Sequence, residues 1–218
     1  HGHKLLGGTQ PCHGIKFVLM REEMKKAHPE LYLLSGGKRD TQHKGSGAPD
    51  LTSPLLLKKH LKYARAMFDH FRQPMLNIDI VDGYGGMISD NPAWTSQLTP
   101  DRGWGGGMSE LVWAYLNRVA TELYRSHPDR FVCGLSYSAY RLPPEKIDKM
   151  SPNLALIECR QRQSFWNDEM LATHRALRAA WLKKLTSGKY FTWDYSVNAR
   201  PEQAGRPVYY TRQIARDL

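Results

Sequence analysis

Residues 74–86 read PMLNIDIVDGYGG, and the architecture expected for this chain rests on them. Met75–Val81 is mostly apolar and rich in branched side chains, which indicates a strand buried on both faces. Asp79 within it is expected to point into the interior or to pair with a lysine. The strand ends at Asp82, and a glycine-rich loop follows. A carboxylate at the carboxyl end of a buried strand is typical of the catalytic face of an α/β barrel.

Strand patterns and helix patterns alternate along the rest of the chain. Further strands are expected at Leu31–Leu34, Phe131–Leu135, Asn153–Ile157 and Tyr190–Trp193. Alternation of this kind is typical of parallel βαβ units. A full (β/α)8 barrel has eight strands and about 250 residues, whereas about five strands are expected here.

We therefore predict an α/β fold of the (β/α)8 TIM type, as the later part of a barrel or an incomplete one. Residues 1–218 are expected to form a single barrel catalytic domain that is a piece of a longer chain. A doubly wound sheet is the alternative architecture. The sequence has neither the Gly-x-Gly-x-x-Gly turn nor the phosphate loop that would favour it.

Capping residues and apolar stripes predict the helices. Ser53, followed by Pro54, is expected to cap one helix, and Ser109 is expected to cap the next. The apolar stripes recur at intervals of three and four residues. They are Leu57, Leu61, Ala64, Phe68 and Phe71 in the first helix, and Val112, Leu116, Val119 and Leu123 in the second. A short helix is expected at 21–27 and a last long one between Asp168 and Gly188.

The segment Tyr84–Met108 is predicted to be a long, glycine-rich loop. Long loops inside compact domains are usually functional or disordered, and Trp94 and Trp104 favour a functional loop. We expect it to lie over the strand end at Asp82 and to become ordered when a ligand binds.

The composition is that of a globular protein, with 41% hydrophobic and 24% charged residues. The net charge is +10, but the basic residues are scattered and no nucleic-acid-binding motif accompanies them, so no nucleic acid partner is expected. No apolar run approaches the ~20 residues of a membrane helix, so no membrane insertion is expected. Cys12, Cys133 and Cys159 form neither a disulfide framework nor a zinc ribbon, and we interpret the last two as core residues.

Carboxylates close three of the expected strands: Asp82, Glu158 and Asp194. Because the carboxyl ends of barrel strands meet on one face, these three are expected to share a pocket. The aromatic and polar side chains near the same ends are Tyr84, Tyr137, Tyr140, Arg160, Trp193, Tyr195 and Asn198. Flat rings contact the C–H face of a sugar, and amide and guanidinium groups bind its hydroxyls.

Glycoside hydrolysis requires such a set, because one carboxyl protonates the leaving oxygen while a second attacks the anomeric carbon or activates water. Asp82 and Glu158 are predicted to be this pair, in either order. Asp194 is predicted to orient the sugar or to belong to the pair itself. The predicted substrate is an oligosaccharide or polysaccharide, and no cofactor is expected. Tyr140, Trp193 and Tyr195 are the expected sugar platform.

Other interpretations of the same residues stay open. Each carboxylate on its own could cap a helix or pair with an arginine such as Arg160. A non-catalytic glycan-binding barrel would keep the aromatic rings without a productive carboxyl pair, and a binder of anionic polymers would use the charge excess. A metallohydrolase through His1, His3 and Asp194 has few ligands. No Gly-x-Ser-x-Gly elbow is present.

Several segments together suggest a family: Ala27–Leu34, the strand that ends in Asp82-Gly83, Ala139–Pro144, Pro152–Leu154 and Trp193–Tyr195. They resemble the bacterial family called domain of unknown function 4838, over most of the chain. The resemblance implies a glycoside-hydrolase-like TIM barrel for polysaccharide degradation, in a secreted or periplasmic protein. Paired cysteines are usual in the family after the strand-Asp-Gly motif, and residues 87–94 have none here. Nothing in the sequence indicates the oligomeric state.

Overall fold

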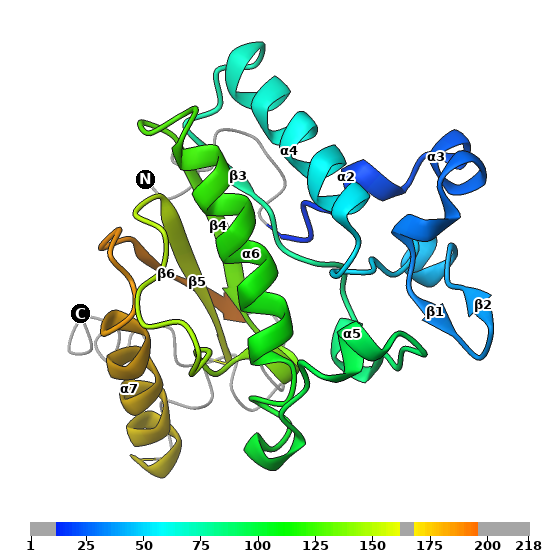
Figure 1. The fold of residues 1–218 in the computed structure, drawn as a ribbon. Coiled ribbons are helices and arrows are strands. Elements are labelled where there is room, and N and C mark those ends of the chain that lie inside the picture. The colour runs from blue at the N-terminus through cyan, green and yellow to red at the C-terminus, as the bar shows by residue number, and fades with distance from the viewer. Residues whose placement is uncertain (1–11, 162–167, 196–218) are drawn as a thin grey trace.

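The computed structural model describes residues 12–161 and 168–195 (Figure 1). His1, His3 and Asn198 lie outside these ranges, so the predictions made for them have no structural counterpart. Within the described ranges, no helix is both long enough and apolar enough to cross a membrane.

A four-stranded parallel sheet forms the centre of the molecule, in the order β3-β4-β5-β6. Its strands are β3 (Met75–Asn77), β4 (Phe131–Ser136), β5 (Leu154–Gln161) and β6 (Tyr190–Tyr195). Each neighbouring pair runs parallel. The predicted parallel pairing of these four strands is confirmed, and the fold is mixed α/β.

The long helices lie on one side of this sheet. They are α4 (Pro54–Asp69), α6 (Ser109–Tyr124) and α7 (Asp168–Leu182). Figure 1 shows α6 lying along the sheet in front of β4 and β5, with α4 beside it. Gly134 in β4 permits this approach, because a Cβ there would lie 2.8 Å from Leu116 of α6. Trp113 of α6 meets Trp181 of α7 edge to face, with ring centroids 4.5 Å apart.

Side chains alternate between two faces of the sheet, as the pleat requires. On the helix face, Leu76, Val132, Leu154 and Leu156 belong to the main core. On the other face, a second cluster contains Met75, Cys133, Leu135, Ala155, Ile157 and Cys159. We call this second side the inner face. The interpretation of Cys133 and Cys159 as buried residues is confirmed.

Strand β3 is shorter than predicted, because only Met75–Asn77 stays in the ladder. The following residues up to Val81 remain buried. The Ile78 amide still donates to the Cys133 carbonyl of β4, but the Asp79 carbonyl accepts from the Ile15 amide at 3.0 Å. The N-terminal segment therefore covers the free edge of β3.

The first helices and turns form a lobe at the opposite side of the molecule from β6 (Figure 1). It contains α2 (Lys16–Leu19), α3 (Glu22–Ala27), η1 (Pro29–Leu31), β1 (Leu34–Ser35), β2 (Lys38–Arg39) and η2 (His43–Gly45). The strand predicted at Leu31–Leu34 is wrong, since β1 begins at Leu34 and pairs antiparallel with β2. Gly36 and Gly37 close this hairpin at φ 56° and 73°, values that glycine adopts without strain.

Most helix predictions are confirmed, with two corrections. The Ser53 hydroxyl accepts from the Leu56 amide, so it caps α4 as expected. Ser109 is not a cap: it is the first residue of α6, and its hydroxyl donates to the Leu142 carbonyl at 2.6 Å. Phe71 lies beyond the end of α4 and is 65% exposed, whereas the other stripe residues of both helices are buried.

The segment predicted as a loop contains three short helical turns: η3 (Tyr84–Gly86), α5 (Pro92–Thr95) and η4 (Pro100–Arg102). Trp94 is fully buried, and its indole donates to the Tyr84 hydroxyl at 2.8 Å. The expectation that this segment is ordered only by a ligand is therefore wrong for its first half. Trp104, in contrast, is 67% exposed.

Candidate functional site

A cavity of about 240 Å³ opens on the inner face, at the carboxyl ends of the strands. Its lining residues are Cys12, His13, Asp82, Leu135, Tyr137, Cys159, Trp193 and Tyr195. Leu135, Cys159 and Tyr195 lie in the last halves of β4, β5 and β6, and Asp82 follows β3. Ligands of parallel α/β sheets bind at this edge.

Asp82 is the accessible carboxylate of this cavity, with 46% of its side chain exposed. The Tyr137 hydroxyl lies 3.5 Å from Oδ1, and the Lys44 ammonium lies 3.8 Å from Oδ2. The main chain is also held, because Nε2 of His43 donates to the Asp82 carbonyl at 2.6 Å. Gly83 follows at φ 75°, which turns the chain away from the cavity without strain. Asp82 is thus fixed at its backbone while its carboxylate faces solvent.

Asp79 is a second carboxyl near the cavity, but it is completely buried. The Tyr140 hydroxyl lies 3.5 Å from Oδ2, and Nδ1 of His13 lies 3.9 Å from the same oxygen. Burial raises the pKa of Asp79 to about 8, so this carboxyl holds a proton near neutral pH. Asp79 points to the inner face, which was one of its two predicted placements. Its neighbours there are Tyr140 and His13.

Each aspartate has its own tyrosine, and the two environments differ. Burial raises the pKa of Tyr137 and of Tyr140, so both phenols remain hydrogen-bond donors. The two rings meet edge to face with centroids 6.3 Å apart. Asp79 is thus a buried carboxyl beside Tyr140, whereas Asp82 is an accessible carboxyl beside Tyr137.

Aromatic rings form one wall of the cavity. Trp193 and Tyr195 alternate on β6, and their centroids are 6.3 Å apart at an interplanar angle of 53°. Both side chains are partly exposed. The structure therefore places these two predicted substrate-binding residues, together with Tyr137, in the same cavity as Asp82.

Glu158 does not share this cavity. Strand β5 continues to Gln161, so Glu158 lies within the strand and on the helix face, opposite in register to Thr192. Its side chain is 1% exposed and accepts from Nδ1 of His174 and from the Tyr190 hydroxyl, both at 2.7 Å. The expectation that Glu158 ends a strand beside Asp82 is corrected by this longer strand.

Other predicted site residues also lie elsewhere. Tyr84 is a core residue whose hydroxyl donates to the Pro49 carbonyl at 2.9 Å. Tyr140 is 1% exposed and does not line the cavity, although its ring contacts that of Tyr137 and its hydroxyl lies near Asp79. Arg160 is 5% exposed and is absent from the cavity lining. Asp194 pairs in register with Arg160 in the sheet, and nothing further is described of its side chain.

His13, Cys12 and Cys159 line the cavity, although no sequence pattern predicts a site role for them. No periodic pattern marks residues 12–14, and the bonds of the His13 ring and of the Gly14 amide reach residues more than sixty positions away. The one local signal is the adjacent Gly14, since a glycine can mark a position at which two backbone segments lie in close contact. Within residues 12–161 and 168–195, no group of three or more His, Cys, Asp or Glu side chains is arranged to hold a metal ion.

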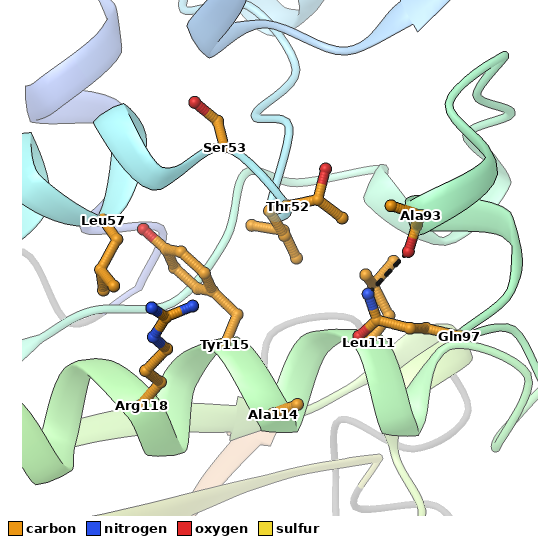
Figure 2. Close-up of a pocket in the computed structure, with 10 residues that line it drawn as sticks. Thr52, Ser53, Leu57, Ala93, Gln97, Leu111, Ala114, Tyr115 and Arg118 are labelled. Atoms are coloured by element: carbon orange, nitrogen blue, oxygen red, sulfur yellow. Dashed lines mark hydrogen bonds between the residues drawn. The ribbon is translucent and has the colours of Figure 1, made fainter.

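A second cavity, of about 210 Å³, lies among the helices (Figure 2). Thr52, Ser53 and Leu57 border it from the start of α4, and Tyr115 and Arg118 border it from α6. The remaining lining residues are Leu51, Ala93, Gln97, Leu111 and Ala114. Its lining contains no carboxylate and no imidazole, so it lacks groups for acid–base chemistry near neutral pH. The inner-face cavity is therefore the candidate functional site.

Comparison with protein families gives one match, to the family described as "Domain of unknown function (DUF4838)", over residues 3–218. No curated protein and no solved structure matches the chain. Because the family model spans nearly the whole chain, the protein belongs to the family described as domain of unknown function DUF4838.

Proposed function

We propose that this protein is a carbohydrate-active enzyme that hydrolyses glycosidic bonds in the inner-face cavity. The observation that carries the proposal is the position of Asp82: an accessible carboxylate at the carboxyl edge of a parallel sheet, in one cavity with Tyr137, Trp193 and Tyr195. A sugar that stacks on this aromatic wall would present its ring carbons and glycosidic oxygen to the carboxylate.

The architecture supports a barrel of the (β/α)8 type. All four strands are parallel, and the long helices cover one face of the sheet. In a doubly wound sheet, helices would cover both faces. In the described ranges, the inner face instead bears an apolar cluster and the cavity. This is the arrangement of a barrel interior with its site at the carboxyl ends.

Asp82 is the proposed nucleophile or water-activating carboxylate. Both roles require a carboxylate that a substrate or a water can reach, and the side chain of Asp82 is 46% exposed. Asp194 stays a predicted second carboxylate or sugar-orienting group at the end of β6. Glu158 faces the other side of the sheet and is not part of this proposal. Export from the cell remains a prediction from the family.

The test is turnover of a panel of aryl glycosides and oligosaccharides by the complete protein and by Asp82→Asn. Asparagine keeps the shape but can neither attack nor accept a proton, so we expect turnover to fall by about 10²–10⁴-fold. Asp148→Asn, at an exposed bend, is the matched control and should be silent. Glu110 is unsuitable as a control, because it is 4% exposed and accepts from the Lys146 amide. Undiminished turnover by Asp82→Asn would remove Asp82 from the mechanism.

A non-catalytic glycan-binding barrel is the second candidate. The observation that favours it is that the structure shows the aromatic wall without Glu158 beside Asp82. In that case the protein would bind oligosaccharides, Trp193→Ala would weaken binding, and no glycoside in the panel would be cleaved. Calorimetric titration with oligosaccharides, run beside the turnover assay, distinguishes the two functions.

A further inference from the structure

Residues 13–15 are hydrogen-bonded to the end of β3 and to the residues that follow it. The Gly14 amide donates to Oδ1 of Asn77 at 3.0 Å, and the Ile15 amide donates to the Asp79 carbonyl at 3.0 Å. A Cβ at Gly14 would lie 1.8 Å from the Asn77 carbonyl oxygen, so only glycine allows this contact. His13 is thereby held in a fixed position at the cavity.

The backbone of His13 is strained. Its φ is 55°, in the left-handed region that a residue with a Cβ adopts at a cost of about 1–2 kcal/mol. Strained residues that the surrounding structure holds in place are concentrated at functional sites. The bonds of Gly14 and Ile15 supply that support here.

The ring of His13 has a defined orientation. Nδ1 lies 2.7 Å from the Ile80 carbonyl oxygen, which can only accept, so Nδ1 carries a hydrogen. In the neutral ring the lone pair is therefore on Nε2, which has no hydrogen-bond partner among residues 12–161 and 168–195. The side chain is 20% exposed and lines the cavity with Asp82.

Asp79 stands behind this ring. Its Oδ2 is 3.9 Å from Nδ1, and Asp79 is the only acidic group that pairs with His13 in the described part of the chain. An imidazole with one nitrogen fixed by a carbonyl and a carboxyl behind it, and the other nitrogen available, has the arrangement of a general acid or base.

We propose that His13 is the proton-transfer residue of the cavity, with Asp79 and the Ile80 carbonyl as its positioning groups. This inference rests on the proposed function. Glycoside hydrolysis also needs a proton donor for the leaving oxygen, and Asp82 has the role of nucleophile or water-activating group, so His13 would be that donor. The protonated ring would give the Nε2 proton to the glycosidic oxygen while the C–O bond breaks and its electron pair goes to that oxygen. Water then adds at the anomeric carbon and gives up one proton, which returns through Asp82 or solvent to Nε2, so one water is consumed overall and no proton is gained or lost.

The most informative variant is His13→Asn. Asparagine is among the residues that tolerate a positive φ, and its amide nitrogen can replace Nδ1 as the donor to Ile80. The variant therefore keeps the fold and removes Nε2. His70→Asn, at an exposed position after α4, is the matched control. On a substrate that the wild-type protein cleaves, we expect His13→Asn to lower turnover by about 10²–10⁴-fold and His70→Asn to leave it unchanged. Full turnover by His13→Asn would overturn the proposal.

A second readout needs no substrate, so it separates this inference from the proposed function. Diethyl pyrocarbonate acylates an unprotonated, accessible imidazole nitrogen, and peptide mass spectrometry identifies the residue. We expect His13, whose side chain is 20% exposed, to be labelled in the folded protein, more slowly than the exposed His70, and the fully buried His60 to stay unlabelled. Asp79→Asn should change the labelling rate of His13 and leave that of His70 unchanged. A His13 that stays as unlabelled as the buried His60 would contradict an available Nε2.

Discussion

Nδ1 of His174 in α7 lies 2.7 Å from Oε1 of Glu158 in β5. The contact joins the last long helix to the sheet, and the Tyr190 hydroxyl of β6 completes it at 2.7 Å from Oε2. A carboxyl group buried in this way has both oxygens engaged in structural contacts, which explains a glutamate on the helix face of the parallel sheet.

Glu158→Gln should destabilise the fold without affecting the cavity. A glutamine has one side-chain oxygen where glutamate has two. It therefore cannot accept from both His174 and Tyr190, and one of these donors loses its partner. We expect the free energy of unfolding in urea to fall by about 1–3 kcal/mol. Glu169→Gln, at an exposed position in the first turn of α7, is the control. A change below about 0.5 kcal/mol at Glu158 would mean that the contact is dispensable.

Asp79 should make the fold less stable as pH rises. Its pKa is about 8 in the folded protein against 3.8 when exposed, so the folded state binds the extra proton between these values. The contribution of Asp79 to stability is therefore complete below pH 4 and is lost as pH rises through 8. The slope is at most about 1.4 kcal/mol for each pH unit.

Asp79→Asn tests this directly, because asparagine resembles the protonated acid. We expect the variant to match the wild-type protein near pH 4 and to exceed it in melting temperature above pH 8. Asp148→Asn, at an exposed bend, should follow the wild-type curve. Identical slopes for Asp79→Asn and wild type between pH 4 and 8 would contradict a buried, protonated Asp79.

His60 should have the opposite effect, on the acid side. It is fully buried on α4, with Nδ1 3.0 Å from the Tyr115 hydroxyl of α6, and burial lowers its pKa to about 4. The folded state therefore resists protonation, so the contribution of His60 is complete above pH 6.5 and is lost as pH falls towards 4. His60→Asn keeps a partner for Tyr115 but cannot titrate.

Chemical denaturation at several pH values measures this effect. We expect His60→Asn to be less stable than wild type at pH 7, since a smaller side chain leaves space in the core, and to lose less stability between pH 6.5 and 4. A variant whose stability falls as steeply as that of the wild-type protein over this range would show that other groups cause the acid sensitivity.

The sequence patterns were sufficient for the elements whose signals are local. Ser53-Pro54 marked the start of α4, and the strands β4, β5 and β6 were found where short runs of aliphatic or aromatic residues occur. The face of Glu158 could not be found in this way. The predicted strand ended at Ile157, one residue before Glu158, whereas β5 continues to Gln161. Within a strand, successive side chains point to opposite faces, so Glu158 lies on the face opposite to that of Ile157.

The candidate site was predicted in part for the same reason. Asp82, Trp193 and Tyr195 follow from strand ends, and they do share a cavity. Tyr84 was wrongly predicted to bind substrate. It is buried in the core, where its hydroxyl accepts from the indole of Trp94, and no local sequence pattern indicates this packing. His13 was missed because its role depends on bonds to Ile80 and Asp79 across more than sixty residues and on a backbone angle that side-chain type does not predict.

Gly14 is the position at which a single methyl group should separate the N-terminal segment from the sheet. Gly14→Ala would place Cβ 1.8 Å from the carbonyl oxygen of Asn77, and backbone atoms of a buried strand cannot move aside as a flexible side chain would. We expect a loss of about 3 kcal/mol or more in the free energy of unfolding. Gly86→Ala is the matched control: a Cβ there meets nothing within 4 Å, and its φ is not positive, so stability should change little. In a Gly14→Ala protein that still folds, the His13 labelling rate should also change, because Gly14 fixes the ring next to the cavity. Wild-type stability together with an unchanged labelling rate would show that the segment does not lie against Asn77.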